Sequence, residues 1–213
     1  MKDNVFFVSG IDTNVGKSYA TGYLAKTWNE QGVRTITQKF IQTGNVGMSE
    51  DIELHRKIMG TGLLPEDESG LTMPEIFTYP CSPHLAAEID HRPIDFDKIE
   101  KATRQLSETY DAVLLEGAGG LMVPLTRDLL TIDYVAQKNY PLIFVTSGKL
   151  GSINHTLLSL EAITRRGIRL HTVAYNLFPE EDDDIIRRDT EAYIRDLLAK
   201  EYPETHFVVI PQL

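Results

Sequence analysis

The sequence contains a single cysteine, Cys81, and its longest apolar runs are no longer than a β-strand. One cysteine excludes an intramolecular disulfide framework, and the short apolar runs exclude a transmembrane helix, which needs about 20 apolar residues. Residues 1–4 lead directly into the first apolar run, so we expect no signal peptide. Together these absences predict a cytoplasmic location.

Basic residues are also scarce, at 21 against 31 acidic residues, which leaves a net charge of -10. This deficit argues against an extended nucleic-acid-binding surface and against binding to anionic membranes. We therefore expect neither nucleic acid nor membrane as a partner. An anionic ligand has to be bound locally, by backbone amides and a few cationic side chains.

The chain shows no tract rich in proline, glycine and serine that would act as a linker, and it shows no internal repeat. With 213 residues, 42% of them hydrophobic, it can bury one sizeable core. We expect one α/β domain that covers residues 1–213.

Strand-like and helix-like patterns alternate along the chain. Strands are predicted at 4–9, 34–40, 111–115, 142–146, 170–175 and 207–210, and helices at 17–31, 51–59, 96–109, 153–166 and 183–200. A further helix is predicted to begin at Pro83, and residues 60–74 are predicted to be loop. The alternation predicts a mainly parallel β-sheet flanked by helices.

A glycine-bounded loop follows the first predicted strand and ends in Gly16-Lys17-Ser18, at the start of the first predicted helix. Free backbone N–H groups at a helix start hold phosphate oxygens, and the helix dipole favours the negative charge. Lys17 would add charge at the outer phosphates, and the Ser18 hydroxyl is placed to bind Mg²⁺. Five residues separate Gly10 from Gly16, one more than in the common P-loop pattern. With this loop, the expected fold is like that of P-loop nucleoside triphosphate hydrolases. The alternative is a tight strand-to-helix turn without a ligand.

Ligands of parallel sheets gather at the carboxyl ends of the strands, so the segments after each predicted strand should meet at one edge. Glu116 ends a buried strand there, where a carboxylate is costly unless a cation or hydrogen bonds compensate it, and Mg²⁺ would do so. The glycines after Glu116 suit a close backbone approach to phosphate, and they make us expect the strand to end at 115. Asp51 is a further candidate oxygen ligand, with a helix N-terminal acid as the alternative.

Two lysines are candidates for the chemistry at the same edge. Lys39 could neutralise charge on a transferring γ-phosphoryl group, or it could extend outward into solvent. Lys149 lies in a second glycine-flanked loop and is ambiguous by itself. We favour packing or local hydrogen bonding for Cys81, His84 and His155, and the other four histidines lack the spacing of metal ligands.

Four separated stretches, at 10–18, 82–84, 116–120 and 149–155, resemble those of dethiobiotin synthetase, the ATP-dependent enzyme family of biotin synthesis. The longer phosphate loop is the family's own form, and Glu116 followed by Gly-Ala-Gly-Gly is the more discriminating motif. The resemblance implies ATP-dependent carboxylation and cyclisation of 7,8-diaminononanoate with CO₂ or bicarbonate. The products would be dethiobiotin, ADP and phosphate.

The resemblance also implies the roles of individual residues. It implies Lys39 as the catalytic lysine, Thr43 and Lys149 at the substrate, and Ser18, Asp51 and Glu116 at Mg²⁺. Asn176 would contact the nucleotide base. The nucleotide-binding residues would be Asn14, Val15, Gly16, Lys17, Ser18, Tyr19, Asp51, Glu116, Gly117, Ala118, Gly119 and Asn176.

The family resemblance implies a homodimer with the substrate near the subunit interface. The chain stops at Leu213, where relatives typically continue through a base-contacting loop, so we expect weaker discrimination between ATP and other triphosphates.

Two other functions compete with this interpretation. A partition-type ATPase would switch dimerisation without small-molecule chemistry, but its lysine near the start of the phosphate loop is missing, since Ile11 and Asp12 follow Gly10. An amide-forming cobyrinate-type synthetase usually carries an additional glutaminase domain, for which 213 residues leave no room.

Overall fold

The computed structural model describes residues 4–178 and 183–212. Met1, Lys2 and Asp3, on which the expectation of no signal peptide partly rests, lie outside the described residues. Six strands form the central sheet: β1 (Val5–Gly10), β2 (Thr35–Lys39), β5 (Ala112–Gly120), β6 (Leu142–Ser147), β7 (Leu170–Asn176) and β8 (His206–Ile210). Their order in space is β2-β5-β1-β6-β7-β8, and every pairing is parallel. The predicted parallel sheet is confirmed.

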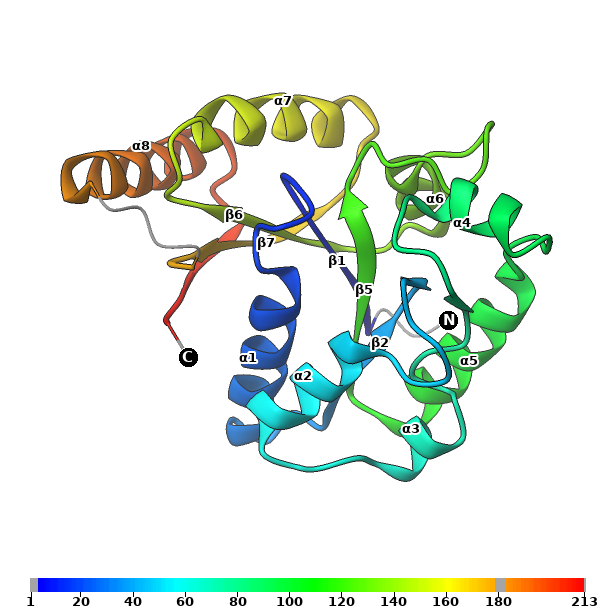
Figure 1. Ribbon diagram of the computed structural model, residues 1–213. Coiled ribbons are helices and arrows are strands. Elements are labelled where there is room, and N and C mark those ends of the chain that lie inside the picture. The colour runs from blue at the N-terminus through cyan, green and yellow to red at the C-terminus, as the bar shows by residue number, and fades with distance from the viewer. Residues whose placement is uncertain (1–3, 179–182, 213) are drawn as a thin grey trace.

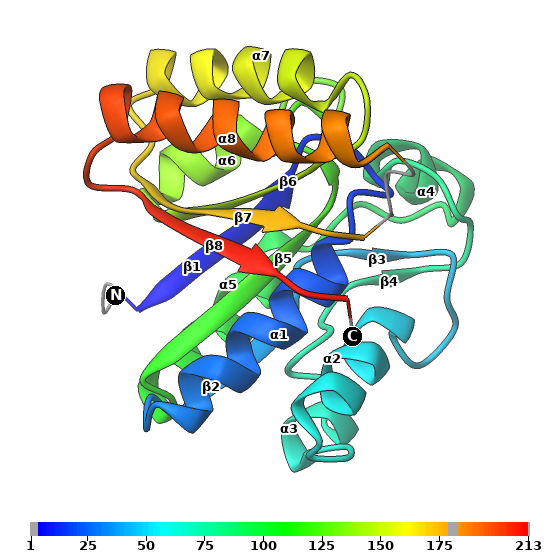
Figure 2. The ribbon, with the colours of Figure 1, turned by 90° about the vertical axis from the view of Figure 1, so that its left-hand side faces the viewer.

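Helices cover both faces of this sheet (Figures 1 and 2). On one face lie α1 (Lys17–Glu30) and α2 (Glu50–Met59), which pack against each other. On the other face lie α5 (Phe96–Thr109), α6 (Thr131–Lys138), α7 (Ser152–Arg165) and α8 (Asp184–Glu201). The remaining elements are α3 (Pro65–Glu68), α4 (Pro83–Ile89) and a separate parallel pair, β3 (Gln42–Thr43) and β4 (Ile76–Phe77).

Side-chain alternation along the strands divides the core between the two faces. In β1, Phe7 belongs to the cluster under α5 to α8, and Val8 belongs to the cluster under α1. Because both faces are covered, the strands are apolar on both sides, which explains why they appear as continuous apolar runs in the sequence. In the described residues, we find no helix with the length and hydropathy needed to cross a bilayer.

The expectation that the strand after residue 111 ends at 115 is wrong. Strand β5 continues through the glycines to Gly120, because Gly120 pairs with Gly10 of β1 beyond a register shift. Gly117 has a packing reason, since a Cβ there would lie 2.8 Å from Phe7 Cε1. The sequence also gave no indication of α6, because β-branched and aromatic residues fill its first turns and its N-cap, Leu130, offers no side-chain hydrogen bond. It likewise missed α3, which lies in the segment predicted as loop, β4, which follows that segment, and β3, which precedes α2.

Candidate active site at the carboxyl edge of the sheet

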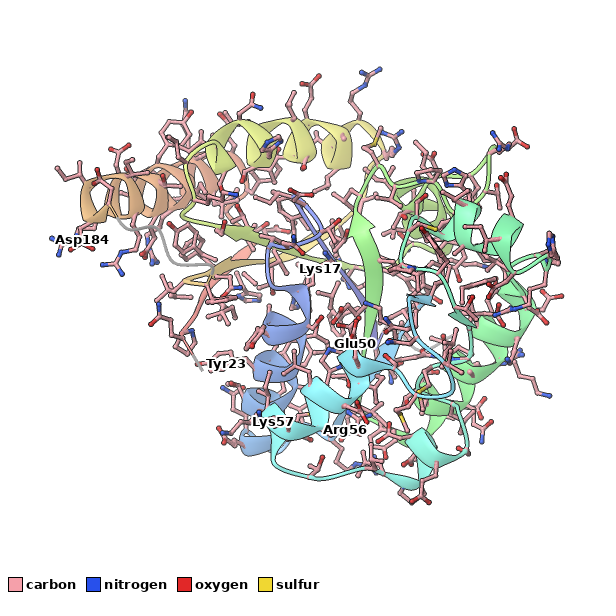
Figure 3. The ribbon with its side chains drawn as sticks, viewed as in Figure 1. Lys17, Tyr23, Glu50, Arg56, Lys57 and Asp184 are labelled. Carbon is pink, nitrogen blue, oxygen red and sulfur yellow. The ribbon has the colours of Figure 1, made fainter. Side chains whose placement is uncertain are left out.

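A cavity of about 930 Å³ opens where β1, β2 and β5 end. The phosphate loop, the start of α2 and the loop before α4 all contribute to its wall. Figure 3 labels Lys17 at the start of α1 and Glu50 at the start of α2, and these helices lie side by side on one face of the sheet. The cavity therefore lies at the edge where ligands of parallel α/β sheets bind.

The loop between β1 and α1 has the backbone shape of an anion site. Gly16 is the N-cap of α1 in the left-handed conformation, with φ of 82°, and no side chain caps the helix. No acidic residue lies in the first turn. The N-terminal amides and the positive end of the helix dipole are therefore available to an anion.

The end of β7 supports this loop from the side. Asn176 Nδ2 donates to the carbonyl of Val15 over 2.9 Å, and its Oδ1 accepts from the N–H of Phe178. A Cβ on Gly16 would lie 2.0 Å from Asn176 Nδ2, so only glycine fits there. Both ends of the Asn176 amide are thus engaged within the chain, and its base-contacting role stays a prediction.

Lys17 points back over the loop. Its ammonium donates to the carbonyls of Asp12 and Thr13 over 2.8 and 3.0 Å. Burial lowers the pKa of Lys17 to about 8, although the charge of Glu116 acts in the opposite direction. An anion in the loop would favour the protonated form, because an opposite charge nearby stabilises the ammonium.

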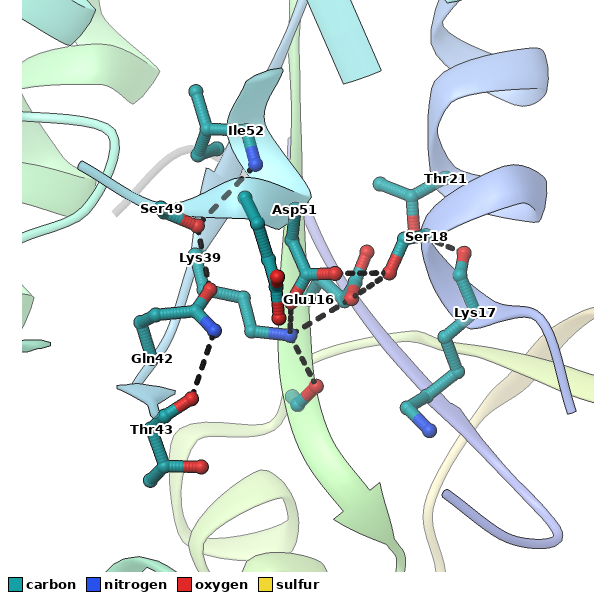
Figure 4. Close-up of polar contacts among 12 residues, drawn as sticks. Lys17, Ser18, Thr21, Lys39, Gln42, Thr43, Ser49, Asp51, Ile52 and Glu116 are labelled. Atoms are coloured by element: carbon teal, nitrogen blue, oxygen red, sulfur yellow. Dashed lines mark hydrogen bonds and ion pairs between the residues drawn. The ribbon is translucent and has the colours of Figure 1, made fainter. Parts of the chain in front are cut away.

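Ser18, Lys39, Asp51 and Glu116 converge on one wall of the cavity (Figure 4). Ser18 Oγ lies 2.6 Å from Asp51 Oδ1 and 2.9 Å from Glu116 Oε1. The ammonium of Lys39 lies between the carboxylates, 2.5 Å from Asp51 Oδ2 and 2.9 Å from Glu116 Oε1. Residues far apart in the sequence thus form one charged cluster.

Each member of this cluster owes its place to a local feature of the chain. Lys39 ends β2 in register with Glu116 of β5, which brings the two side chains together across neighbouring parallel strands. Asp51 lies in the first turn of α2, and this helix begins at the N-cap Ser49, whose Oγ accepts from the N–H of Ile52. The Ser49 hydroxyl also donates to Gln42 Oε1 over 2.5 Å, which attaches the start of α2 to β3.

The charges of the cluster stabilise each other. Glu116 is fully buried, which by itself raises the pKa of a carboxyl, but Lys39 and His55 outweigh burial and hold the pKa well below the ordinary value. For Lys39, burial lowers the pKa, but the charges of Glu116 and Asp51 outweigh it and raise the pKa above its ordinary value. Lys39 is therefore an ammonium ion and Glu116 a carboxylate across the physiological pH range.

The oxygen atoms of Ser18, Asp51 and Glu116 fit a divalent cation. The single Ser18 hydroxyl proton can serve only one of the two carboxylate oxygens beside it. Mg²⁺ is bound in nucleotide sites by one or two carboxylates together with phosphates and waters. Within residues 4–178 and 183–212, no group of three or more His, Cys, Asp or Glu side chains is arranged to hold a metal, so this site would depend on phosphate oxygens as well.

Most residues expected at the site do surround the cavity. They are Asn14, Gly16, Lys17, Ser18, Tyr19, Lys39, Thr43, Asp51, Glu116, Ala118, Gly119 and Lys149. Thr43 lies on β3, and the exposed Lys149 approaches from the loop before α7. Val15, Gly117 and Asn176 are not among the lining residues. Asn176 supports the phosphate loop through the carbonyl of Val15, and Gly117 packs closely against Phe7.

Sequence reasoning missed His55, which is buried against the carboxylate of Glu116. Its Nε2 lies 2.8 Å from Glu116 Oε2, and its Nδ1 lies 3.0 Å from Thr37 Oγ1. A signal was present, because His55 lies four residues after Asp51 on one helix and Thr37 lies two residues before Lys39 on one strand. These spacings place each pair on one face of its element.

The comparisons with known proteins agree with this architecture. A family model described as an AAA domain matches residues 4–213. The chain is similar over its whole length to two solved structures, each with 12% sequence identity. The MinC:MinD cell division complex of Aquifex aeolicus gives a TM-score of 0.55, with 99% of this chain and 82% of that chain covered. The ParA family ATPase of Chlorobium tepidum gives a TM-score of 0.53, with 99% of this chain and 85% of that chain covered. This similarity confirms the P-loop fold and carries no argument about activity.

Three curated relatives are similar at much higher identity. The ATP-dependent dethiobiotin synthetase BioD 2 of Pasteurella multocida is 53% identical, with 97% of this chain and 96% of the relative covered. The enzyme of the same name from Haemophilus influenzae is 57% identical, with 86% and 96% covered. The ATP-dependent dethiobiotin synthetase BioD of Chlorobaculum tepidum is 52% identical, with 90% and 80% covered. With this identity over most of its length and a phosphate loop beside a lysine–carboxylate cluster, the chain belongs to the family of ATP-dependent dethiobiotin synthetases.

Proposed function

We propose that this protein closes the ureido ring of dethiobiotin from 7,8-diaminononanoate, CO₂ and ATP, with release of ADP and phosphate. The observation that carries the proposal is the Lys39 ammonium between Asp51 and Glu116, beside a phosphate loop, in a chain more than half identical to dethiobiotin synthetases. Such a site supplies positive charge and alignment rather than a protein nucleophile, which is what phosphoryl transfer requires.

The loop at 10–18 binds the triphosphate through its backbone amides and the start of α1. Lys17 exchanges its contacts with the carbonyls of Asp12 and Thr13 for phosphate oxygens, which it can do because its side chain already lies over the loop. Tyr19 and Phe178 lie close together on the wall of the cavity, with ring centroids 5.6 Å apart, and they flank the same end of the site.

Ser18, Asp51 and Glu116 hold Mg²⁺ together with the phosphates. When bound, the ion neutralises charge on the phosphate oxygens. The side chains of Asp51 and Glu116 then keep Lys39 in place as well, because the ammonium contacts both carboxylates.

The chemistry proceeds in two displacements. One amine takes up CO₂ as a carbamate, a carbamate oxygen attacks the γ-phosphorus, and the bond to the bridging oxygen of ADP breaks. The second amine then attacks the carbamoyl carbon, phosphate leaves, and the amine proton passes to solvent. Lys39 stabilises the charge that builds up on the transferring group, because its raised pKa keeps it an ammonium and prevents it from acting as a base. Thr43 and Lys149, which also line the cavity, contact the diamine or its carbamate.

We also propose that the protein is a cytoplasmic homodimer. Leu158 of α7 is 58% exposed and Met122 is 54% exposed, and both line a depression of about 480 Å³. Leu150, at 73% exposed, lies in the same cavity-side loop as Lys149. The same depression is also lined by the charged side chains of Glu161, Arg165 and Arg166. A second copy that covers these exposed apolar side chains and pairs with the charged ones would bring its own chain close to the substrate side of the cavity.

The decisive experiment is mass-spectrometric detection of dethiobiotin from 7,8-diaminononanoate, bicarbonate, Mg²⁺ and ATP. We expect product with the wild-type chain and none with Glu116→Ala. Parallel reactions with GTP and CTP measure how strictly ATP is preferred. Consumption of ATP without a ureido product would overturn the proposal in favour of a nucleotide switch.

A further inference from the structure

His55 is part of a buried polar chain that begins at Glu116 and leads away from the cavity. Glu116, His55 and Thr37 are each fully buried, and Arg56 is 1% exposed. Glu116 Oε2 contacts His55 Nε2, His55 Nδ1 contacts Thr37 Oγ1, and Thr37 Oγ1 receives a hydrogen bond from Arg56 Nη1 over 2.7 Å. None of the functions considered above uses this chain of contacts.

The far end of this chain is fixed. Arg56 makes a bidentate contact with Asp67: its Nε donates to Oδ2 and its Nη2 donates to Oδ1, each over 2.8 Å. Asp67 also accepts from the Thr72 hydroxyl and from the N–H of Leu64, both at 2.7 Å. A planar guanidinium held by two parallel bonds has little freedom to turn, so its remaining contact with Thr37 has a defined direction.

The positions of the protons follow from which atoms can donate a hydrogen bond and which can only accept one. Glu116 is a carboxylate and can only accept, so the proton between it and His55 lies on Nε2. In the neutral ring Nδ1 is then the acceptor and takes the hydroxyl proton of Thr37, whose oxygen accepts from Arg56. The other neutral tautomer would place two lone pairs against each other at 2.8 Å.

This tautomer determines how Glu116 presents itself to the cavity. Oε2 receives the N–H of His55, whereas Oε1 faces Ser18 Oγ and the Lys39 ammonium. We propose that His55 is a positioning residue, which the Thr37 and Arg56 side chains hold with its Nε2–H toward Glu116 so that one Glu116 oxygen stays turned toward Ser18 and Lys39. The expected effect on catalysis rests on the proposed function, whereas the tautomer of His55 and its contact with Glu116 do not.

Such a role has a physical rationale. A carboxylate held through only one oxygen can rotate about its terminal torsion, whose preferred angles are spread over a broad range. A hydrogen bond from His55 to Oε2 of Glu116 removes that freedom. Groups that orient the ligands of a metal typically contribute about 10- to 100-fold in metal affinity or activity. We expect the same from His55, although it touches neither substrate nor nucleotide.

The first test measures the tautomer in the protein without substrates. Long-range ¹H–¹⁵N spectra of ¹⁵N-histidine-labelled protein report which ring nitrogen carries the proton, and the resonances of His55 are those that disappear in His55→Gln. We expect a protonated Nε2 and an unprotonated Nδ1. Thr37→Val removes the hydroxyl that faces Nδ1 and should shift the Nδ1 resonance, whereas the carboxylate of Glu116 keeps the proton on Nε2. Thr103→Val is the matched control, because it removes a buried hydroxyl that contacts Gln38 and leaves His55 alone. A protonated Nδ1 in the wild type overturns the inference.

The second test measures kcat and KM for dethiobiotin formation and the Mg²⁺ dependence of nucleotide binding. In His55→Leu, we expect kcat for dethiobiotin formation to fall about 10- to 100-fold with little change in KM for the diamine. The Mg²⁺ concentration needed for half-maximal binding of a non-hydrolysable ATP analogue should rise by a similar factor, about 10- to 100-fold. His55→Gln should recover most of both losses, because its side-chain amide offers an N–H at about the place of the imidazole Nε2.

Circular dichroism and urea unfolding establish that each variant is folded. If His55→Leu does not fold, Thr37→Val and His55→Gln still test the inference by the same measurements. Unchanged kcat and Mg²⁺ dependence in a folded His55→Leu or Thr37→Val variant overturn it. Because the spectra and the binding assay need no diamine, failure of ureido formation in the wild type would refute the proposed function while leaving these two measurements decisive for His55.

Discussion

Asn176 at the end of β7 donates a hydrogen bond to the carbonyl of Val15 over 2.9 Å, across 161 positions of sequence. This bond supports the phosphate loop from behind at the residue before Gly16. It explains why Gly16 tolerates no side chain, since a Cβ would lie 2.0 Å from Asn176 Nδ2. The shape of the loop thus depends on a strand from the other half of the chain.

Gly16→Ala should therefore distort the loop. We expect a loss of about 2–4 kcal/mol in the free energy of unfolding, from the positive φ and the collision together, and a loss of nucleotide binding. Gly60→Ala is the matched control, because Gly60 has a φ of 73° but open space around it, and it should lose only about 1–2 kcal/mol. Urea unfolding measures both. If the effects of Gly16→Ala and Asn176→Ala simply add in the double variant, the collision is not the cause.

Lys17→Ala should weaken nucleotide binding and turnover together. A charge-assisted hydrogen bond contributes about 1.5–3 kcal/mol, which corresponds to about 10- to 100-fold in affinity. Isothermal titration calorimetry with a non-hydrolysable ATP analogue and Mg²⁺ measures the change. Lys26→Ala serves as the control, because Lys26 is an exposed lysine on the same helix. An unchanged affinity in Lys17→Ala would contradict the assigned phosphate contact.

Lys39→Met should separate chemistry from binding. We expect kcat for dethiobiotin formation to fall about 10²- to 10³-fold, the usual loss when a group that stabilises transition-state charge is removed. Nucleotide affinity should change much less, because the backbone amides of the loop and Lys17 remain. The rate is measured by mass spectrometry of the product, with Lys26→Met as the control. Equal losses in affinity and kcat would show that Lys39 acts mainly in nucleotide binding.

The buried pair of Arg56 and Asp67 makes a prediction about acid stability. Removing one partner of such a pair costs about 3–5 kcal/mol, so Asp67→Asn should be that much less stable at pH 7. The folded pKa of Asp67 is lowered: burial raises it, but the hydrogen bonds from Arg56 and Thr72 outweigh burial. The contribution is therefore complete above the unfolded pKa of 3.8 and disappears as the pH falls through the lower folded value.

Urea unfolding at pH 7 and at the lowest pH at which the chain still folds gives the free energy of unfolding of wild type and Asp67→Asn. The difference between these two free energies should be smaller at the acidic pH. A difference that stays constant down to pH 3 would exclude an ionised Asp67 as its source. Asp111→Asn is a suitable control, because Asp111 pairs with Arg34 at the surface, where ion pairs contribute about 0–1 kcal/mol.

The proposed homodimer predicts that Leu158→Glu dissociates the protein. The new carboxylate would replace an apolar contact and would lose its hydration on association. Sedimentation velocity should show a dimer for the wild type and a monomer for the variant. Leu63→Glu, which changes an exposed leucine between α2 and α3, should leave the dimer intact. A wild-type chain that sediments as a monomer would refute the proposal.

Periodic patterns predicted the main elements because hydrophobic periodicity and helix caps are local properties. Asp95 does cap α5, with its side chain accepting from the N–H of Lys98, and α4 does begin at Pro83. The same rules failed for β5, which continues through its glycines because Gly10 of the neighbouring strand pairs with Gly120. Neither local propensity nor composition contains that information.

Part of the candidate site was predictable for a similar reason. The carboxyl ends of parallel strands meet at one edge, so residues that end β2 and β5 must be neighbours, and Lys39 and Glu116 are in register there. Asp51 joins them only because α2 packs beside α1, and Ser49 and Gln42 fix where α2 begins. His55 was missed because its partners, Thr37 and Glu116, lie 18 and 61 residues away.

The sequence by itself determined the alternation of strands and helices, the glycine-bounded loop before α1 and the edge of the sheet where charged residues gather, since each depends on neighbours along the chain. The tertiary structure alone decided which oxygen of Glu116 faces Lys39, which ring nitrogen of His55 faces Glu116, and how Asn176 supports Val15. These are contacts of a few ångströms between separate elements. Their geometry is set when the helices pack on the sheet, and no local pattern records that packing.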